Sequence, residues 1–425
     1  MTQKSISFSP AEYRRRLMLT RAAMAELDLD AVFVEDPSNM AWLTGYDGWS
    51  FYVHQGLIIT HDTDPVWWGR NMDANGARRT AWIGEDVIRP YGDEYVQSTS
   101  RHPMQHLAAL LKEMGYETAR IGVEMENYYF SAKAYTTLLA ELPQAEIVDA
   151  TALVNWQRAV KSDEELIFMH RAARIAEKMV LGAIDRSEAG VKKNELVADI
   201  YHDALTGADG HWGDYPAIVP MCPSGADASA AHLTWNGAEL KSGECTFFEL
   251  AGVYRRYHMP LSRTVFLGTP PEDMKRAEAA LVEGLEAGID AARAGNVAGD
   301  IARALAGPLE RAGIERGARC GYSIGLSYPP DWGERTISLR DEDETELLPG
   351  MTFHFMPGLW TPEWGLEITE PMLITQSGPA KPFCNLPRQL FVKPDRIPTM
   401  LPMDHRDPIP AAALAAQELS KENPI

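Results

Sequence analysis

A long helix predicted to begin near residue 162 divides the chain into two parts with different patterns. Ser162 followed by Glu165 forms a capping-box pattern, in which each side chain accepts a hydrogen bond from the other residue's backbone N–H. The apolar residues that follow recur at spacings of three and four along one helix face; they are Phe168, Ala172, Ile175, Ala176, Met179, Val180 and Ala183. Since 425 residues exceed what one hydrophobic core usually supports, we expect this helix to open a second domain.

The first 158 residues alternate between helical and strand-like patterns. An amphipathic pattern predicts a helix from Pro10 to about Leu27. Short apolar strands are predicted at Ala31–Val34, Gly56–Thr60, Val66–Trp68, Arg120–Glu124 and Glu146–Val148, and further helices at residues 74–82, 102–115 and 131–141. This alternation predicts an α/β domain over residues 1–158.

Residues 159–390 instead predict an antiparallel sheet backed by helices, an α+β domain. Helical patterns cover residues 272–293 and 297–313, and Pro308 is expected to kink the second helix. The strand-like runs are Thr246–Val253, Tyr257–Leu267, Met351–Met356 and Leu366–Thr375. Residues 391–425 are rich in proline and charge, which predicts an extended tail whose Ala/Leu segment either forms a short helix or is disordered.

Charge and composition restrict the possible partners. The formal charge of -20 repels nucleic-acid phosphates and anionic lipid surfaces, although it suits either a solvated surface or a site for a cation. The sequence shows no leader pattern and no run of about 18 apolar residues, so we expect a cytoplasmic protein that binds neither nucleic acid nor membrane. The cysteines are too scattered for a metal cluster or a disulfide framework; they are Cys222, Cys245, Cys320 and Cys384.

Four sequence blocks resemble the creatinase, prolidase and methionine aminopeptidase superfamily, in the order that the family has them. The blocks are residues 248–268, Gly321–Leu326, Pro349–Phe353 and Leu366–Thr375. The resemblance implies the superfamily's pita-bread fold for residues 159–390, preceded by the α/β domain of its two-domain members. It also implies a homodimer in which an N-terminal loop completes the partner's site.

The metal ligands of that superfamily are largely missing from the matching positions. Metal-dependent members use two Asp, one His and two Glu to hold a pair of divalent ions. Here the corresponding residues are Glu249, Pro260, Tyr322 and Met356, and only Glu370 lies near the last Glu position. Because proline has no side-chain donor and a thioether is a poor ligand for hard ions, we exclude a two-metal peptidase mechanism and expect no metal or other cofactor.

Creatinase is the superfamily's precedent for hydrolysis without a metal, and it uses a catalytic histidine. The segment from Ser224 to His232 resembles the one that carries this histidine, which implies a catalytic role for His232. Histidine is also the side chain best able to move protons near neutral pH. A structural role is the alternative for a single histidine.

A finer resemblance, over about residues 8–393, is to the ectoine hydrolases, which open the tetrahydropyrimidine ring of a compatible solute. The segments that carry it are residues 43–52, 67–76, 213–220 and 326–335. The resemblance implies a small zwitterionic amidine as substrate, either ectoine or 5-hydroxyectoine. Hydrolysis of a ring C–N bond would then give an N-acetyl-2,4-diaminobutyrate.

An amidinium that also bears a carboxylate needs an anion, a cationic donor and aromatic walls around it. We expect Glu249 and Glu370 to face the amidinium, and Arg263 or Arg335 to face the carboxylate. The other candidate contacts, each with a structural role as its alternative, are Trp49, Phe51, Tyr52, Trp332 and His258. The roles of the carboxylates stay open, because Glu367 and Glu370 lie three apart and alternation along a strand puts them on opposite faces.

Glu249 is the predicted nucleophile at the amidine carbon, or else the base that activates water there. His232 and Tyr322 are predicted to pass a proton to the departing ring nitrogen. Two other hypotheses stay open, namely a creatinase-like amidinohydrolase acting on another guanidino or amidine compound, and an inactive binding homologue. The presence of both His232 and Glu249 favours an enzyme.

Overall fold

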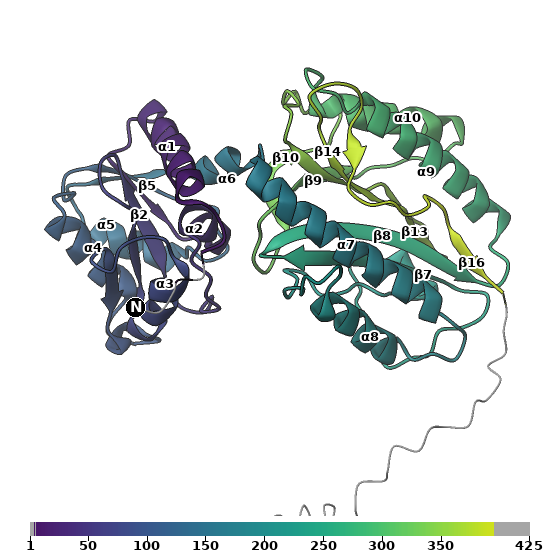
Figure 1. Cartoon of the computed structure of the whole chain (residues 1–425), viewed down its shortest axis with the longest axis horizontal. Helices are drawn as coiled ribbons and strands as arrows, with labels where there is room; N and C mark the ends of the chain where they lie inside the picture. The colour runs from purple at the N-terminus through teal and green to yellow at the C-terminus, as the bar shows by residue number, and fades with distance from the viewer. Residues whose placement is uncertain (1–3, 5, 395–425) are drawn as a thin grey trace, which may run out of the picture.

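A six-stranded sheet forms the centre of the N-terminal region (Figure 1). The structure is a computed structural model, and it describes residue 4 and residues 6–394. The sheet has the order β4-β3-β2-β1-β5-β6, with β1 (Ala31–Val34), β2 (Gly56–Thr60), β3 (Val66–Arg70), β4 (Ile88–Tyr91), β5 (Arg120–Val123) and β6 (Glu146–Asp149). Strand β2 runs antiparallel to its two neighbours, and the other pairings are parallel.

Helices cover both faces of this sheet, because side chains along each strand alternate between two cores. Val32 and Val34 face a core shared with α1, α2 and α3, whereas Phe33 faces a core shared with α4 and α5. The helices of this region are α1 (Pro10–Glu26), α2 (Pro37–Thr44), α3 (Ala74–Thr80), α4 (Pro103–Glu113), α5 (Ala132–Glu141) and α6 (Leu153–Arg158), with short 3-10 turns η1 (Asn71–Asp73) and η2 (Asp93–Tyr95).

The C-terminal region has two halves, each with strands packed against a pair of helices (Figure 1). In the first half, β7 (Cys245–Tyr254) and β8 (Tyr257–Leu267) share a core with α7 (Asp163–Arg186) and α8 (Lys193–Thr206). In the second half, the sheet β10-β9-β11-β14-β15 shares a core with α9 (Glu272–Ala291) and α10 (Ala298–Arg311). Within the described residues, no helix is both long enough and apolar enough to cross a lipid bilayer.

The strands of the second half are short, and two smaller sheets accompany them. The five-stranded sheet contains β9 (Gly321–Ile324), β10 (Gly333–Ser338), β11 (Thr352–Phe355), β14 (Glu370–Leu373) and β15 (Lys381–Pro382). A two-stranded sheet pairs β12 (Gly358–Trp360) with β13 (Gly365–Glu367), and β16 (Phe391–Lys393) adds to β8 in parallel. The 3-10 turn η3 (Gly225–Ser229) precedes β7.

The predicted helix start at Ser162 is confirmed. The Ser162 hydroxyl accepts a hydrogen bond from the Glu165 backbone N–H, and the Glu165 carboxylate accepts one from the Ser162 N–H at 2.9 Å. The strands predicted in the first region are also confirmed, but β4 was not predicted, because Arg89 and Pro90 interrupt its apolar pattern at the sheet edge.

Two predictions near the C-terminus were wrong in detail. The single strand predicted over Leu366–Thr375 is two strands, β13 and β14, separated by Ile368 and Thr369. The predicted tail from residue 391 begins with β16, which belongs to the sheet of β7 and β8, while residues 395–425 lie outside the described part.

Pro308 lies within α10, which continues beyond it to Arg311.

Candidate active site

Glu249, Glu367 and Tyr322 lie close enough together for the Glu249 charge to act on the other two side chains. They come from β7, β13 and β9, so the site joins the two halves of the C-terminal region. All three are buried, with relative exposures of 5% for Glu249, 0% for Glu367 and 8% for Tyr322. A substrate in contact with them is therefore largely shielded from bulk water.

Glu249 is held by backbone pairing on both sides of its strand. Its N–H and C=O exchange hydrogen bonds with Met221, at 3.2 and 3.1 Å, and its other neighbour is Ser262 of β8. Its carboxylate makes no side-chain hydrogen bond within the described part of the chain. Burial raises the pKa of Glu249 to about 7, so this carboxyl changes charge near neutral pH.

Glu367 is the buried carboxylate without a protein partner. Neither of its oxygens meets a donor at full hydrogen-bond geometry within the described residues, although the Ser262 hydroxyl, which has no other partner there, lies close enough to act on it, and no cation pairs with it. Burial and then the negative charge of Glu249 raise its pKa well above the ordinary value, while the nearby Ser262 hydroxyl acts in the opposite direction. Buried charged groups are normally paired, so two unpaired carboxylates side by side indicate a site for a cationic ligand.

Tyr322 belongs to a chain of hydrogen bonds that the sequence did not reveal. The Trp332 indole N–H donates to its hydroxyl at 2.6 Å, and the same hydroxyl lies 3.0 Å from Nδ1 of His354. Nε2 of His354 in turn lies 2.9 Å from Oγ1 of Thr369. Burial, and then the charge of Glu249, raise the pKa of Tyr322 well above its ordinary value, so the phenol keeps its proton at neutral pH.

His354 was not among the predicted residues, although the sequence contained a signal for it. It stands between Phe353 and Phe355 in a strand that was predicted, and a polar residue there points away from its apolar neighbours. The register of β9 and β11 places it directly opposite Tyr322.

Glu370 and Arg263, predicted to bind the two ends of the substrate, are instead paired with each other. Arg263 Nη2 lies 2.6 Å from Glu370 Oε1, and both side chains have no exposure. Arg263 also donates to the carbonyl of Thr369 at 2.6 Å and to that of Pro387 at 2.8 Å. This pair holds neighbouring segments together, and Glu367 takes the place that was predicted for Glu370.

His258 has both ring nitrogens occupied by backbone groups. Its Nε2 accepts a hydrogen bond from the Ala217 N–H at 2.8 Å, and its Nδ1 lies 2.9 Å from the carbonyl oxygen of Arg256. Burial lowers its pKa to about 3, so the ring is neutral. The arrangement anchors the segment around Ala217 and leaves no ring nitrogen free for a substrate.

His232 lies on the exposed segment that follows η3. Within the described residues, it makes no hydrogen bond or ion pair with Glu249 or Tyr322. The structure of the single chain therefore does not bring the predicted catalytic histidine together with the other two catalytic candidates.

The predicted aromatic contacts divide into buried and exposed residues. Trp332 is buried and bonded to Tyr322, as described above. Trp49 and Tyr52 are exposed, at 60% and 64%, in the loop after α2. Phe51 lies between them and packs against Tyr328 of the C-terminal region, with ring centroids 5.7 Å apart. Trp49 also packs against Tyr215, with ring centroids 4.8 Å apart, so the loop rests on its own chain while more than half of the Trp49 and Tyr52 side chains stays exposed.

Arg335 lies at the contact between the two regions, away from the buried carboxylates. It has a positive φ of 58°, donates a hydrogen bond to the carbonyl of Glu126 and stacks over Tyr128 at 4.6 Å. These contacts explain its position as an interdomain link. The structure assigns it no contact with Glu249 or Glu367 among the described residues.

The donor atoms at the superfamily's metal positions do not fit a pair of divalent ions. Pro260 lies opposite Ala251 in the β7–β8 pairing, and Met356 follows β11. In the part of the chain that the structure describes, no group of three or more His, Cys, Asp and Glu side chains is arranged to hold a metal ion. Glu249 and Glu367 supply two hard donors, fewer than such ions require.

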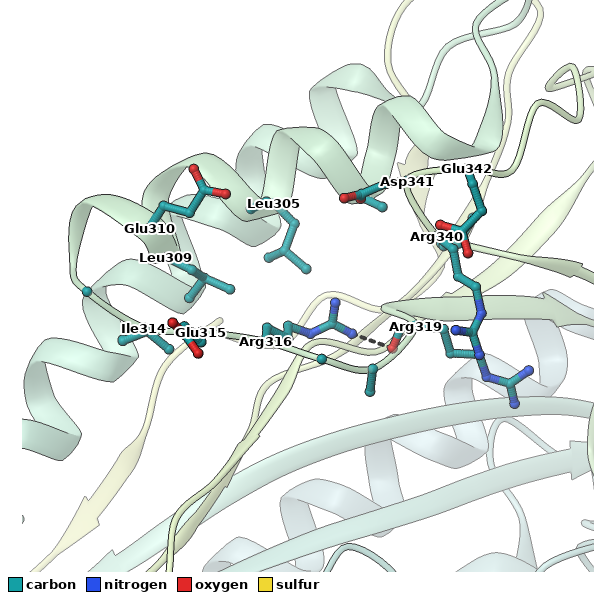
Figure 2. Close-up of a pocket in the computed structure, with 16 residues that line it drawn as sticks. Leu305, Leu309, Glu310, Ile314, Glu315, Arg316, Arg319, Arg340, Asp341 and Glu342 are labelled. Atoms are coloured by element: carbon teal, nitrogen blue, oxygen red, sulfur yellow. Dashed lines mark hydrogen bonds between the residues drawn. The ribbon is translucent and has the colours of Figure 1, made fainter.

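A cavity of about 750 Å³ lies elsewhere, between α10 and the segment that leads to β9 (Figure 2). Neither Glu249 nor Glu367 lines it. In Figure 2, Arg316 donates to the backbone oxygen of Arg319 beneath the helix. The Arg319 guanidinium carbon lies 4.6 Å from the Tyr322 ring centroid, so the cavity ends beside the site without containing its carboxylates.

The C-terminal region consists of two halves that share one site, and an α/β region precedes it. This combination of features identifies the class of protein to which the chain belongs. Residues 16–160 match the Creatinase/Prolidase N-terminal domain, and residues 168–376 match Metallopeptidase family M24. The chain belongs to this creatinase and M24 family, and its C-terminal α+β domain has the pita-bread fold.

Two relatives of known sequence resemble this chain over nearly their whole lengths. The chain is 54% identical over 400 residues to the ectoine hydrolase of Halomonas elongata, covering 92% of this chain and 100% of that protein. It is 37% identical to an uncharacterized hydrolase/peptidase of Sinorhizobium fredii, covering 91% and 99%. The prolidase of Pyrococcus horikoshii shares the fold, with a TM-score of 0.74, 20% identity and coverage of 89% and 100%.

Proposed function

We propose that this protein opens the cyclic amidine ring of ectoine by hydrolysis, without a metal ion, to give an N-acetyl-2,4-diaminobutyrate. The observation that carries the proposal is Glu367, fully buried beside Glu249 with neither oxygen hydrogen-bonded within the described residues. The identity of 54% to an ectoine hydrolase, over the whole length of that relative, supports the choice of substrate.

The carboxylate pair suits an amidinium because of its charge and shape. Each buried carboxylate raises the free energy of the other's ionised form, as the raised pKa of Glu367 indicates. A planar cation with two N–H groups can donate one hydrogen bond to each carboxylate and offset that repulsion. Binding therefore favours the ionised form of Glu249, which is the form that the reaction needs.

In the proposed reaction Glu249 acts on the amidine carbon in one of two ways. It either forms an ester-like bond to that carbon, which water later cleaves, or takes a proton from a water molecule whose oxygen adds to the carbon. In both cases the ring C–N bond breaks, and its electron pair stays on the departing nitrogen. That nitrogen takes a proton from Tyr322, whose high pKa keeps the phenol protonated.

A homodimer is part of the proposal. Trp49 and Tyr52 are large aromatic side chains that are mostly exposed in the single chain. We propose that they pack on the partner subunit and wall its pocket. Light scattering with size-exclusion chromatography tests this, since a monomeric wild-type protein contradicts it. The catalytic role of His232 and the cytoplasmic location of the protein stay predictions.

The first experiment is ring opening of ectoine by the purified protein, followed by NMR of the product. Equal rates with and without a strong chelator, and loss of activity in Glu249→Ala, support the proposal. Activity that requires an added metal ion contradicts its metal-free part. If no product forms from ectoine, the assignment of ectoine as the substrate is contradicted.

A second candidate is hydrolysis of another amidine or guanidino compound. The same carboxylate pair can receive two N–H groups from a guanidinium as readily as from an amidinium. Creatine and 5-hydroxyectoine therefore belong in the same assay. A higher kcat/KM for creatine than for ectoine assigns the site to guanidino compounds.

A further inference from the structure

Four buried residues form a hydrogen-bonded line that ends at Tyr322. The Ser262 backbone N–H donates to Thr369 Oγ1 at 2.8 Å, Thr369 Oγ1 lies 2.9 Å from His354 Nε2, and His354 Nδ1 lies 3.0 Å from the Tyr322 hydroxyl. Thr369 and His354 have no exposure, so water does not replace these contacts. The direction of each bond then follows from counting protons.

Thr369 determines the direction of the line. Its hydroxyl accepts the Ser262 N–H and has one proton to donate. Among the described residues, the acceptor within reach of that proton is His354 Nε2. If His354 instead carried its proton on Nε2, the buried hydroxyl proton of Thr369 would have no acceptor among the described residues, which is unfavourable for a buried donor.

The ring of His354 therefore carries its proton on Nδ1 and donates it to Tyr322. Burial lowers the pKa of His354 to about 3, and the positive charge of Arg319 acts in the same direction, so the ring is neutral at pH 7. The Tyr322 oxygen then accepts two hydrogen bonds, from His354 and from Trp332. With both lone pairs engaged, its own proton must point in the remaining direction.

We propose that His354 is a positioning residue, which as a neutral imidazole with its proton on Nδ1 fixes Tyr322 so that the phenol proton is presented to the departing nitrogen of the substrate. This inference rests on the proposed function for the identity of the reaction. Two N–H donors on the phenol oxygen also stabilise the charge that develops when Tyr322 gives up its proton. Removing His354 should therefore affect turnover more than substrate binding.

The first test needs no substrate. In protein labelled with 15N-histidine, His354 is identified as the resonance pair that disappears in His354→Asn. We expect the chemical shifts of a neutral ring protonated on Nδ1. His258 serves as an internal reference for the same tautomer, since its Nε2 accepts the Ala217 N–H. A proton on Nε2, or a charged ring at pH 7, overturns the inference.

The second test is kinetic and uses a matched pair of variants. An Asn side chain can place an N–H near the position of Nδ1, whereas Leu of similar size cannot donate. We expect His354→Leu to lower kcat about a hundredfold with KM changed by less than about threefold, and His354→Asn to retain kcat within about tenfold. Equal losses in the two variants, or a loss confined to KM, contradict a positioning role.

A third comparison separates positioning from general damage to the fold. In a Tyr322→Phe background, His354→Leu should cause no further loss of kcat, because the residue acts through the missing hydroxyl. Thr369→Val should resemble His354→Leu, and Thr369→Ser should resemble the wild type. A full additional loss in the Tyr322→Phe background contradicts the inference.

Failure of the proposed function and failure of this inference give different results. A wild-type protein that does not open ectoine contradicts the function, while the NMR measurement still decides the tautomer. An active wild-type protein whose His354→Leu variant keeps its kcat contradicts the inference alone.

Discussion

Two pairs of buried carboxylates in the described residues differ in their partners. Glu165 and Glu334 lie where the two regions meet, each with 1% exposure, and both are well paired. Glu165 accepts hydrogen bonds from Trp42 and Tyr257 at 2.9 and 2.8 Å. Glu334 lies 2.6 Å from the ammonium nitrogen of Lys161. Glu249 and Glu367 are buried to a similar degree, but the described residues offer Glu367 no hydrogen bond.

This difference separates a structural role from a functional one. A buried carboxylate costs several kcal/mol of desolvation, which an ion pair and hydrogen bonds can offset within the fold. At the domain contact the protein supplies that offset itself. At Glu249 and Glu367 the described residues supply no cation, so we infer that a bound cationic ligand provides the offset.

The largest expected effect is on catalysis, from Glu249→Gln. The amide cannot act as nucleophile or base, so kcat should fall at least about a thousandfold. Because the substitution also removes an unpaired buried charge, the free energy of unfolding at pH 8 should not decrease. Kinetics and thermal unfolding of the same preparation measure both effects. If the variant were both inactive and strongly destabilised, Glu249 would have a structural role like that of Glu334. The contrast between the two pairs of carboxylates would then not hold.

Lys161→Met is the matched substitution at the domain contact. It leaves Glu334 buried with only the more distant Arg158 guanidinium, at 4.0 Å, as a counter-ion, so we expect a loss of about 2–4 kcal/mol in the free energy of unfolding. Adding Glu334→Gln to this variant should restore part of the loss. Urea unfolding of the wild type and the two variants measures it. A loss under about 1 kcal/mol in the free energy of unfolding would show that the ion pair of Lys161 and Glu334 stabilises the protein no more than a solvent-exposed ion pair does.

The next largest effect is expected on the pH dependence of the free energy of unfolding, which should differ between the two pairs of carboxylates. Since folding raises the pKa of Glu249 from 4.5 to about 7, the folded state holds this proton more tightly than the unfolded state. Its contribution is fully present below pH 4.5 and is lost as the pH rises through 7, by about 3 kcal/mol at most. The difference in unfolding free energy between Glu249→Gln and wild type should therefore grow from pH 5 to pH 8. A constant difference contradicts the raised pKa.

A smaller effect is expected from Glu367→Gln. The amide keeps the shape of the side chain but cannot take up the negative charge that a bound amidinium would stabilise, so KM for ectoine should rise about tenfold or more, with a lesser change in kcat. Glu370→Gln is the control at the neighbouring carboxylate. Because Glu370 pairs with Arg263, its replacement should reduce stability rather than raise KM alone. If Glu370→Gln raised KM and Glu367→Gln reduced stability instead, Glu370 would be the residue that binds the substrate.

Local features of the chain were predicted well, and for a physical reason. The capping pair Ser162 and Glu165 lies three residues apart, so its hydrogen bonds depend on the backbone of a single turn. The strands at Ala31–Val34 and Gly56–Thr60 were also predicted from short apolar runs. The resemblance to the superfamily, together with the identities of Pro260 and Met356, led to the prediction that metal ligands are missing at these positions.

The identity of the free carboxylate was not predictable in the same way. Glu367 and Glu370 are chemically identical and three residues apart, and the break at Ile368 and Thr369 sends them into separate strands. Arg263 then reaches Glu370 across more than a hundred residues of sequence. No spacing rule in the sequence gives that pairing.

By itself, then, the sequence determined where several helices and the longer strands begin, but not α2, α6 or α8, and it gave the family and the candidacy of Glu249 and Tyr322. Only the tertiary structure decided that Glu367 has no ion-pair partner among the described residues, that Glu370 pairs with Arg263 and that His354 lies within hydrogen-bond distance of Tyr322. The reason is that hydrogen bonds within one turn are set by neighbouring residues, whereas burial and the pKa of a carboxylate depend on every segment packed around it.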